Sequence, residues 1–133
     1  MSAPRRLGGA VALWLALLSG AGAQSPSVAQ VETGYLVGLV EASGCTFIRN
    51  GMAYDAVRAA AHLREKSAMV AATGAIGTTE AFIERVATRS SLTGRLYEVS
   101  CVGHERVATA GWLREALARY RASGASRASR DAP

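Results

Sequence analysis

Apolar and polar positions alternate along this chain with two different periods. Apolar residues recur at helical spacing in four stretches, which cover about residues 28–43, 56–70, 79–89 and 109–122. Two shorter stretches, 45–49 and 96–102, are rich in β-forming residues or alternate apolar with polar positions, as strands do. Because two short strands are too few for a large sheet, the pattern predicts a mainly α fold with a small β element (α+β).

Capping and turn residues mark where these segments begin and end. Gly44 is placed to end the first helix as a glycine just beyond its C-terminus. Asn50 and Gly51 form a turn dipeptide after the first strand. Asp55 can cap the second helix, and Thr78 or the threonine after it can cap the third.

The N-terminal stretch has the order of a secretory signal peptide. Arg5 and Arg6 precede an apolar run from Leu7 to Leu18, and a small-residue Ala-x-Ala site ends at Ala23. As a helix this run would be roughly 18 Å long, short of the roughly 30 Å core of a bilayer, so a membrane anchor is disfavoured. We expect a signal peptide at 1–23, a single small domain at 24–122 and a disordered basic tail at 123–133, with no membrane span after cleavage and a periplasmic location.

Charge and cysteine content narrow the functional classes. Loss of Arg5 and Arg6 with the leader lowers the formal net charge from +5 to +3, a balance that favours anionic envelope surfaces. Aromatic residues are not interleaved with basic runs, so a nucleic-acid partner is not expected. Cys45 and Cys101 remain after cleavage and are predicted to form one intramolecular disulfide, because an oxidising compartment permits it.

A set of positions between about Leu36 and Cys101 resembles a family of short exported bacterial proteins that is known only as a domain of unknown function. These positions are Phe47, Ile48, Arg49, Asn50, Gly51, Tyr54, Ala60, His62, Leu63, Lys66, Thr79, Glu80, Phe82, Ile83, Ala87, Thr88, Ser90, Ser91, Thr93, Gly94 and Tyr97. The resemblance implies a small envelope-facing domain in which the matched polar residues matter. It implies no activity, and the last helix with Trp112 lies outside it.

His62 is the first candidate for chemistry. It lies four residues after Arg58 and four before Lys66, so the three share one face of the second helix. Two flanking cations should lower the pKa of the imidazole and leave it neutral, as a base or a hydrogen-bonding partner. The alternative is a histidine that simply bonds a neighbouring backbone or carboxylate group.

Arg49, Glu80 and two adjacent serines are the other candidates. Arg49 and Glu80 could form an ion pair that ties the two halves of the domain together, or Arg49 could belong to an anion-binding pocket. Ser90 or Ser91 could be a nucleophile with His62 as its base, but neither lies in a Gly-x-Ser-x-Gly elbow, and serines after a helix usually serve the turn.

Metal and cofactor sites are not predicted. The two histidines, His62 and His104, have no ligand-like spacing, and the two cysteines are better used in a disulfide.

Two functional hypotheses follow. The first is a non-enzymatic module that binds an envelope protein or an anionic envelope component. Its exposed polar surface would comprise Arg49, His62, Lys66 and Glu80, with Ser90 and Ser91 at the edge. The second is a small hydrolase or ligand-binding enzyme that uses His62, Ser90 or Ser91, and Tyr97. The second requires His62 within hydrogen-bond reach of a serine in a cleft.

Overall fold

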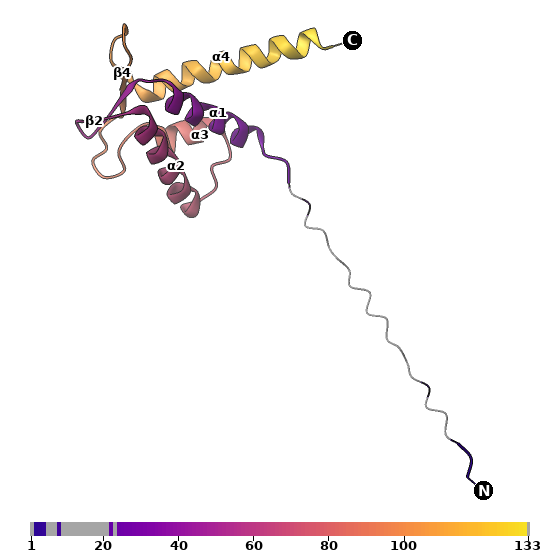
Figure 1. Ribbon diagram of the computed structural model, residues 1–133. Helices are drawn as coiled ribbons and strands as arrows, with labels where there is room; N and C mark the ends of the chain where they lie inside the picture. Colours follow the sequence, from indigo (N-terminus) through magenta and orange to yellow (C-terminus); the bar gives the residue numbers. More distant parts are fainter. Residues whose placement is uncertain (1, 5–7, 9–21, 23, 133) are drawn as a thin grey trace.

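The computed structural model describes residues 2–4, 8, 22 and 24–132, and it confirms a mainly α fold with a small sheet (Figure 1). In chain order the elements are α1 (Val28–Ala42), β1 (Thr46–Arg49), β2 (Met52–Tyr54), α2 (Ala56–Thr73), α3 (Thr79–Phe82), the π-helical segment η1 (Ile83–Ala87), β3 (Glu98–Ser100), β4 (Val107–Ala108) and α4 (Thr109–Arg130). The predicted leader lies almost wholly outside the described residues. No helix in the described part of the chain is long and apolar enough to cross a membrane.

The sheet has four antiparallel strands in the order β2-β1-β3-β4, where the sequence predicted two strands. A tight hairpin joins β1 to β2, and both turn residues have positive φ, 52° at Asn50 and 77° at Gly51. Asn-Gly suits such a turn because both residues tolerate this left-handed region. The strands β2 and β4 have three and two residues, too few to show an alternating pattern in the sequence.

The helices pack together around one apolar core. Its fully buried side chains include Leu36 and Val40 of α1, Phe82 of α3, Ile83 of η1 and Leu113 of α4. The strands lie at one end of the molecule, and the helices extend from there (Figure 1). The small side chains along α2, several of them alanines, allow this helix to approach the core closely.

Local capping accounts for the helix boundaries that the sequence predicted. The Asp55 carboxylate accepts a hydrogen bond from the Arg58 backbone N–H at 2.8 Å, and the Thr78 hydroxyl accepts one from the Ala81 backbone N–H at 3.1 Å. Gly44 has φ of 65°, the conformation expected of a glycine that ends a helix.

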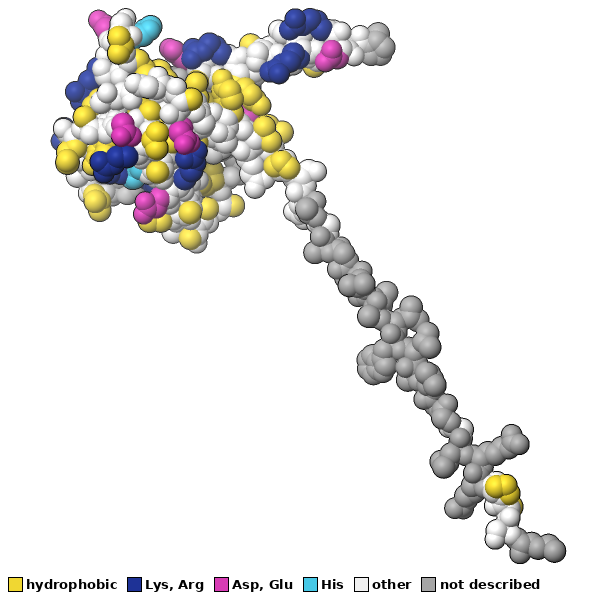
Figure 2. Space-filling model, viewed as in Figure 1, with side chains coloured by type: hydrophobic (Ala, Val, Ile, Leu, Met, Phe, Trp, Pro, Cys, Tyr) yellow, Lys and Arg dark blue, Asp and Glu magenta, His cyan; other side chains and the backbone are white. Residues whose placement is uncertain are grey.

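The basic tail is helical in the structure, where the sequence predicted disorder from Ser123. Its alanines and arginines favour helix, and Arg127 and Arg130 lie in the last turn, where they complement the negative end of the helix dipole. This part of α4 is exposed and projects beyond the body of the domain (Figure 1), and basic side chains lie along it (Figure 2).

The predicted disulfide is confirmed. Cys45 and Cys101 are bonded, with their Cα atoms 4.5 Å apart. Thr46 pairs with Ser100 in the ladder between β1 and β3, so the two cysteines occupy the next position beyond that pair. The bond therefore fastens the beginning of β1 to the end of β3.

Candidate functional site

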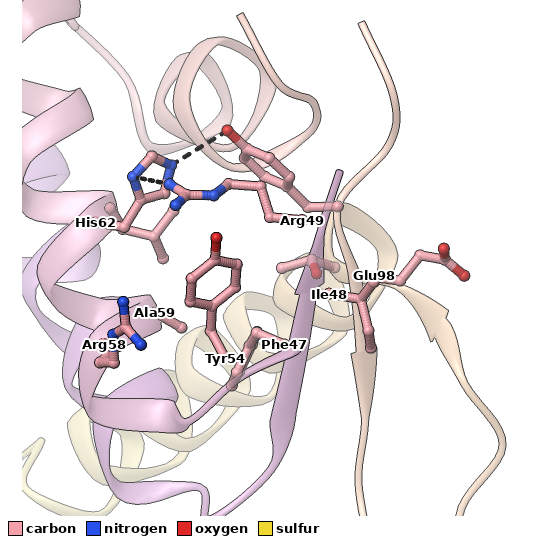
Figure 3. A pocket seen from close by; sticks show the side chains of 11 residues that line it. Phe47, Ile48, Arg49, Tyr54, Arg58, Ala59, His62 and Glu98 are labelled. Carbon is pink, nitrogen blue, oxygen red and sulfur yellow. Dashed lines mark hydrogen bonds between the residues drawn. The ribbon is translucent and has the colours of Figure 1, made fainter. Parts of the chain in front are cut away.

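A small cavity of about 40 Å³ lies between α2 and one face of the sheet (Figure 3). The residues around it come from β1, β2, α2, β3 and the first residue of α4. They are Phe47, Ile48, Arg49, Tyr54, Arg58, Ala59, His62, Leu63, Tyr97, Glu98 and Thr109.

The hairpin and α2 bring two arginines to one tyrosine. Phe47 pairs with Tyr54 across the hairpin, so Arg49, two residues along β1, lies on the same face and diagonal to Tyr54. Arg58 lies in the first turn of α2. The Tyr54 ring lies between the two arginines, with guanidinium carbons 4.6 Å and 5.1 Å from its centroid (Figure 3). Both contacts are cation–π interactions.

A chain of side-chain hydrogen bonds continues from Arg49 into the interior. Arg49 Nη1 bonds His62 Nδ1, and His62 Nε2 lies 3.2 Å from the Tyr97 hydroxyl oxygen. The Lys66 ammonium donates to the same oxygen at 3.1 Å and to the Arg89 carbonyl oxygen at 2.5 Å.

These contacts assign the tautomer of His62. A guanidinium group can only donate, so Nδ1 of His62 accepts and Nε2 carries the hydrogen that is donated to Tyr97. The Tyr97 oxygen then accepts from both His62 and Lys66. The imidazole is neutral, and both of its nitrogens are engaged.

The pKa values of the site follow from burial among like charges. Burial, followed by the positive charges of Arg49 and Lys66, lowers the pKa of His62. Burial and Arg49 lower the pKa of the Lys66 ammonium, and burial raises the pKa of the Tyr97 hydroxyl. The expected neutral state of His62 is thus supported, but burial is the largest cause and Arg49, rather than Arg58, is the strongest neighbouring charge.

The described carboxylates do not neutralise this cluster. Glu98 borders the cavity but is bound by Arg106 through two hydrogen bonds of 2.9 and 3.0 Å. Among the described residues, no carboxylate forms an ion pair with Arg49, Arg58 or Lys66. Glu65 raises the pKa of His62, but less than Arg49 and Lys66 lower it. The site is therefore electropositive, and no described carboxylate is bonded to its cations.

Comparison with known proteins places this site within a recognised family. Residues 27–121 match a family of unknown function (DUF5329). The chain belongs to that family. It is also similar to the uncharacterized protein YfeK of Salmonella typhimurium, with 37% identity over 87 residues, which cover 65% of this chain and 70% of that protein. No solved structure matches the chain.

Membership of the DUF5329 family confirms the resemblance read from the sequence and extends it. The matched region includes every residue around the cavity as well as α4 as far as Arg121, which the sequence comparison had left outside. The family carries no activity, so any function must be argued from the site itself.

Three of the predicted site residues lie together, but one of them is not exposed. Arg49, His62 and Lys66 are joined through the hydrogen bonds around Tyr97. Lys66 is only 4% exposed, so the expectation of an exposed surface is wrong for this residue. Helical periodicity placed it on the polar face, yet its long side chain turns inward to the Arg89 carbonyl.

The serines are not partners of His62. The Ser90 hydroxyl oxygen accepts from the Asn50 side-chain amide at 3.2 Å and from the backbone N–H of Leu92 at 3.2 Å, and Ser91 is exposed in the same turn. The arrangement that the hydrolase hypothesis requires is therefore not the one observed.

Glu80 lies in a different cluster, and its predicted ion pair with Arg49 is wrong. Its carboxylate bonds Arg121 of α4 at 2.6 Å, and Arg121 also bonds the buried Glu32 of α1. No sequence pattern indicates this partner, because α4 meets α1 and α3 only through the tertiary fold.

Two residues of the site escaped the functional analysis of the sequence. Tyr54 belongs to the positions that carry the family resemblance, and its place next to the hairpin was a usable signal. Thr109 was read only as the start of the last helix, and nothing in the sequence indicates that this residue is buried and borders a cavity.

Proposed function

We propose that the protein is a small exported domain of the cell envelope that binds an anionic ligand in the cavity beside Tyr54 and does not transform it. The signal-peptide pattern of residues 1–23 supports export, and so does the disulfide, because such bonds persist in oxidising compartments. A periplasmic location accords with both features.

The observation that carries the proposal is the cationic cluster to which no described carboxylate is bonded. Burial is the largest cause of the lowered His62 pKa, and the positive charges of Arg49 and the buried Lys66 lower it further. Burial and the charge of Arg49 also lower the pKa of Lys66. A bound anion would offset that repulsion. Perturbed pKa values at a concave site are typical of functional sites.

Arginine at the edge of the cavity suits anion recognition. A guanidinium group offers five N–H donors and can bind a carboxylate or phosphate group through two parallel hydrogen bonds. Arg49 uses Nη1 on His62, which leaves other donors, and the exposed Arg58 makes its side-chain contact with the Tyr54 ring.

Binding is favoured over catalysis by the engagement of His62. A general base must be able to take a proton from a reacting group. Both nitrogens of His62 are bonded within the protein, one to a permanent cation. The imidazole therefore holds Arg49 and Tyr97 in place.

The first prediction tests anion binding. Titration of the protein with acetate and with phosphate, followed through the His62 imidazole signals by NMR, should shift those signals and raise the His62 pKa. Arg58→Ala should weaken binding by about tenfold, because a hydrogen bond to a charged group is lost. It should change the unfolding free energy by no more than about 0.5 kcal/mol, as exposed substitutions usually do.

Arg114→Ala is the matched control. Arg114 is also an exposed arginine, but it pairs with Glu84 and does not border the cavity. Equal affinities in folded Arg58→Ala and Arg114→Ala proteins would remove the cavity from consideration as an anion site.

A further inference from the structure

The hairpin turn at 50–52 and the loop at 89–96 form one surface, called here the loop surface, at one end of the sheet. The strands β1 and β3 are antiparallel, with Ile48 opposite Glu98, so the end of β1 and the beginning of β3 lie at the same end. The turn between β3 and β4 projects from the opposite end of the sheet (Figure 1).

Hydrogen bonds join the two segments of the loop surface. The Asn50 side-chain amide donates to the Ser90 hydroxyl at 3.2 Å, and the Thr93 hydroxyl donates to the Asn50 side-chain carbonyl at 2.5 Å. Within the loop, the Ser90 N–H donates to the Arg95 carbonyl and the Gly94 N–H donates to the Ser90 carbonyl, both at 2.9 Å. The surface is therefore preorganised, and binding through it costs little conformational entropy.

Three large apolar side chains of the loop surface are exposed. Leu92 is 93% exposed, Met52 is 63% exposed and Leu96 is 52% exposed. The Leu92 side chain protrudes from the domain, so it can enter an apolar phase without a rearrangement of the fold. Such a transfer is favourable in proportion to the apolar area removed from water.

Two exposed arginines lie beside these apolar side chains. Arg89 and Leu96 are opposite one another in an antiparallel bridge, so their side chains lie on the same face. The Arg95 guanidinium lies against the hairpin turn, where a Cβ atom added at Gly51 would be 3.3 Å from its Nη1.

The loop surface carries no negative charge of its own. The sequence has no acidic residue in 42–54 or in 85–97. Among the described residues, neither Arg89 nor Arg95 forms an ion pair. Both guanidinium groups are therefore available to an anionic partner.

Protruding leucines between arginines suit the surface of an anionic bilayer. Apolar side chains there enter the boundary of the acyl chains, while basic side chains remain among the lipid phosphates. A free anion would use the arginines and leave the leucines exposed. A protein partner would need an apolar pocket shaped to a side chain that protrudes.

We propose that the loop surface docks the domain on an anionic lipid bilayer. Leu92 and Leu96 insert at the level of the headgroups, and Arg89 and Arg95 bind lipid phosphates. This docking is peripheral and does not depend on anion binding in the cavity beside Tyr54.

Vesicle sedimentation tests the docking. The chain is purified from cells with the same N-terminus for every variant, so that residues 1–23, where present, contribute equally. Vesicles of phosphatidylglycerol and phosphatidylcholine in equal parts should sediment the protein. Vesicles of phosphatidylcholine alone should bind it about 25-fold more weakly, because each of the two arginines contributes about fivefold at an anionic surface. Added salt should reduce this difference.

Substitutions separate the apolar and the basic contributions. Leu92→Ser should weaken binding to the anionic vesicles about tenfold, and Arg95→Gln about fivefold. Val102→Ser is the matched control and should bind as the unaltered chain does, because Val102 is 99% exposed in the turn between β3 and β4. All three side chains are exposed, so each variant should keep its melting temperature.

Tryptophan at the same two positions reports insertion directly. Anionic vesicles should shift the emission of the Leu92→Trp protein to shorter wavelength, because the indole leaves water. They should not shift the emission of the Val102→Trp protein, which contains the same native tryptophans.

Three results would overturn the inference. Absence of sedimentation with anionic vesicles would leave the exposed leucines to a protein partner. Equal losses in Leu92→Ser and Val102→Ser would show that binding does not use the loop surface. Binding that depends on Arg95 but not on Leu92 would be attraction by charge without insertion. The NMR titration of His62 tests the proposed function separately from all three.

Discussion

Two oxygen atoms hold the Lys66 ammonium group in the interior of the domain. They are the Arg89 carbonyl oxygen and the Tyr97 hydroxyl, and they come from the segment that follows η1. Neither is negatively charged, so dipoles alone solvate the Lys66 ammonium group, which remains a like-charge neighbour of Arg49. The site is consequently a place where the protein accepts electrostatic cost, as functional sites often do.

Our second prediction concerns the contribution of His62 to the pH dependence of the unfolding free energy. Its pKa in the folded protein lies below the ordinary value of 6.5, so the unfolded chain takes up the proton first as the pH falls. The stability that the neutral His62 contributes is fully present above pH 6.5 and is lost as the pH falls through the lower pKa of the folded state. The slope due to this group is at most about 1.4 kcal/mol per pH unit.

Urea denaturation at a series of pH values measures this slope. The His62→Gln protein should show a smaller slope of unfolding free energy against pH. His104→Gln replaces an exposed histidine and should leave the contribution of His62 to the slope in place. A His62→Gln protein with an unchanged slope between pH 6.5 and 5 would show that the folded-state pKa is not depressed.

The helices and the hairpin turn illustrate what the sequence can predict. Their boundaries depend on local groups, such as the Asp55 cap and the Asn50-Gly51 turn, which act within a few residues of their own position. The strand β4 exists only because it pairs with β3, and two residues carry no periodicity. Elements defined by tertiary pairing were therefore missed.

The same distinction applies to the candidate site. The sequence supplied Arg49, His62 and Lys66, and helical spacing alone placed His62 and Lys66 together. It could not supply the contact between Arg49 and His62, which depends on how the hairpin packs against α2. Nor could it place Glu80, whose partner Arg121 lies 41 residues away in α4.

Arg121 fastens α4 to two other helices. It bonds Glu32 of α1 at 2.8 and 2.9 Å and Glu80 of α3 at 2.6 Å, while the Thr79 hydroxyl donates to the same Glu32 carboxylate. Hydrogen bonds from Arg121 and then Thr79 lower the pKa of Glu32. Arg121 of α4 and Thr79 of α3 thus keep the buried Glu32 carboxylate charged.

Removal of the Arg121 guanidinium should therefore destabilise the domain. Arg121→Ala leaves the Glu32 carboxylate buried without its cation, so we expect the melting temperature to fall by several degrees at pH 7. The deficit should shrink at acidic pH, because the Glu32 pairing stabilises above the ordinary pKa of 4.5 and is lost as pH falls through the lowered value.

Arg119→Ala provides the comparison on the same helix. Arg119 pairs with Glu115 at 3.9 Å, and both side chains are largely exposed, so its loss should leave the melting temperature almost unchanged. Equal melting temperatures for the two variants at pH 7 would mean that Arg121 does not fasten α4.

The disulfide ties together parts of the chain that local interactions leave independent. It joins residues 56 apart in sequence, at the point where β1 and β3 diverge beyond their last pair. The intervening segment contains the hairpin, α2, α3 and η1, which include most of the residues around the cavity. We therefore expect the geometry of the site to depend on whether Cys45 and Cys101 are oxidised to the disulfide.

Our last prediction links this bond to export. In the chain-entropy account, a loop of this length stabilises the folded state by about 4 kcal/mol. That is a large part of the roughly 5–15 kcal/mol typical of a domain. Cys45→Ala with Cys101→Ala should therefore lower the unfolding free energy by about that amount in urea denaturation. A chain with such dependence on oxidation should reach its stable state only after it leaves the cytoplasm.

Intact-mass analysis of protein from fractionated cells tests this link. We expect the periplasmic fraction to contain a chain that begins at Gln24 and gains the mass of two hydrogens on reduction. A full-length cytoplasmic chain with two free thiols would contradict export. The double alanine variant could instead have the same unfolding free energy as the oxidised protein. The disulfide would then not stabilise the domain, and the expected requirement for an oxidising compartment would lose its physical basis.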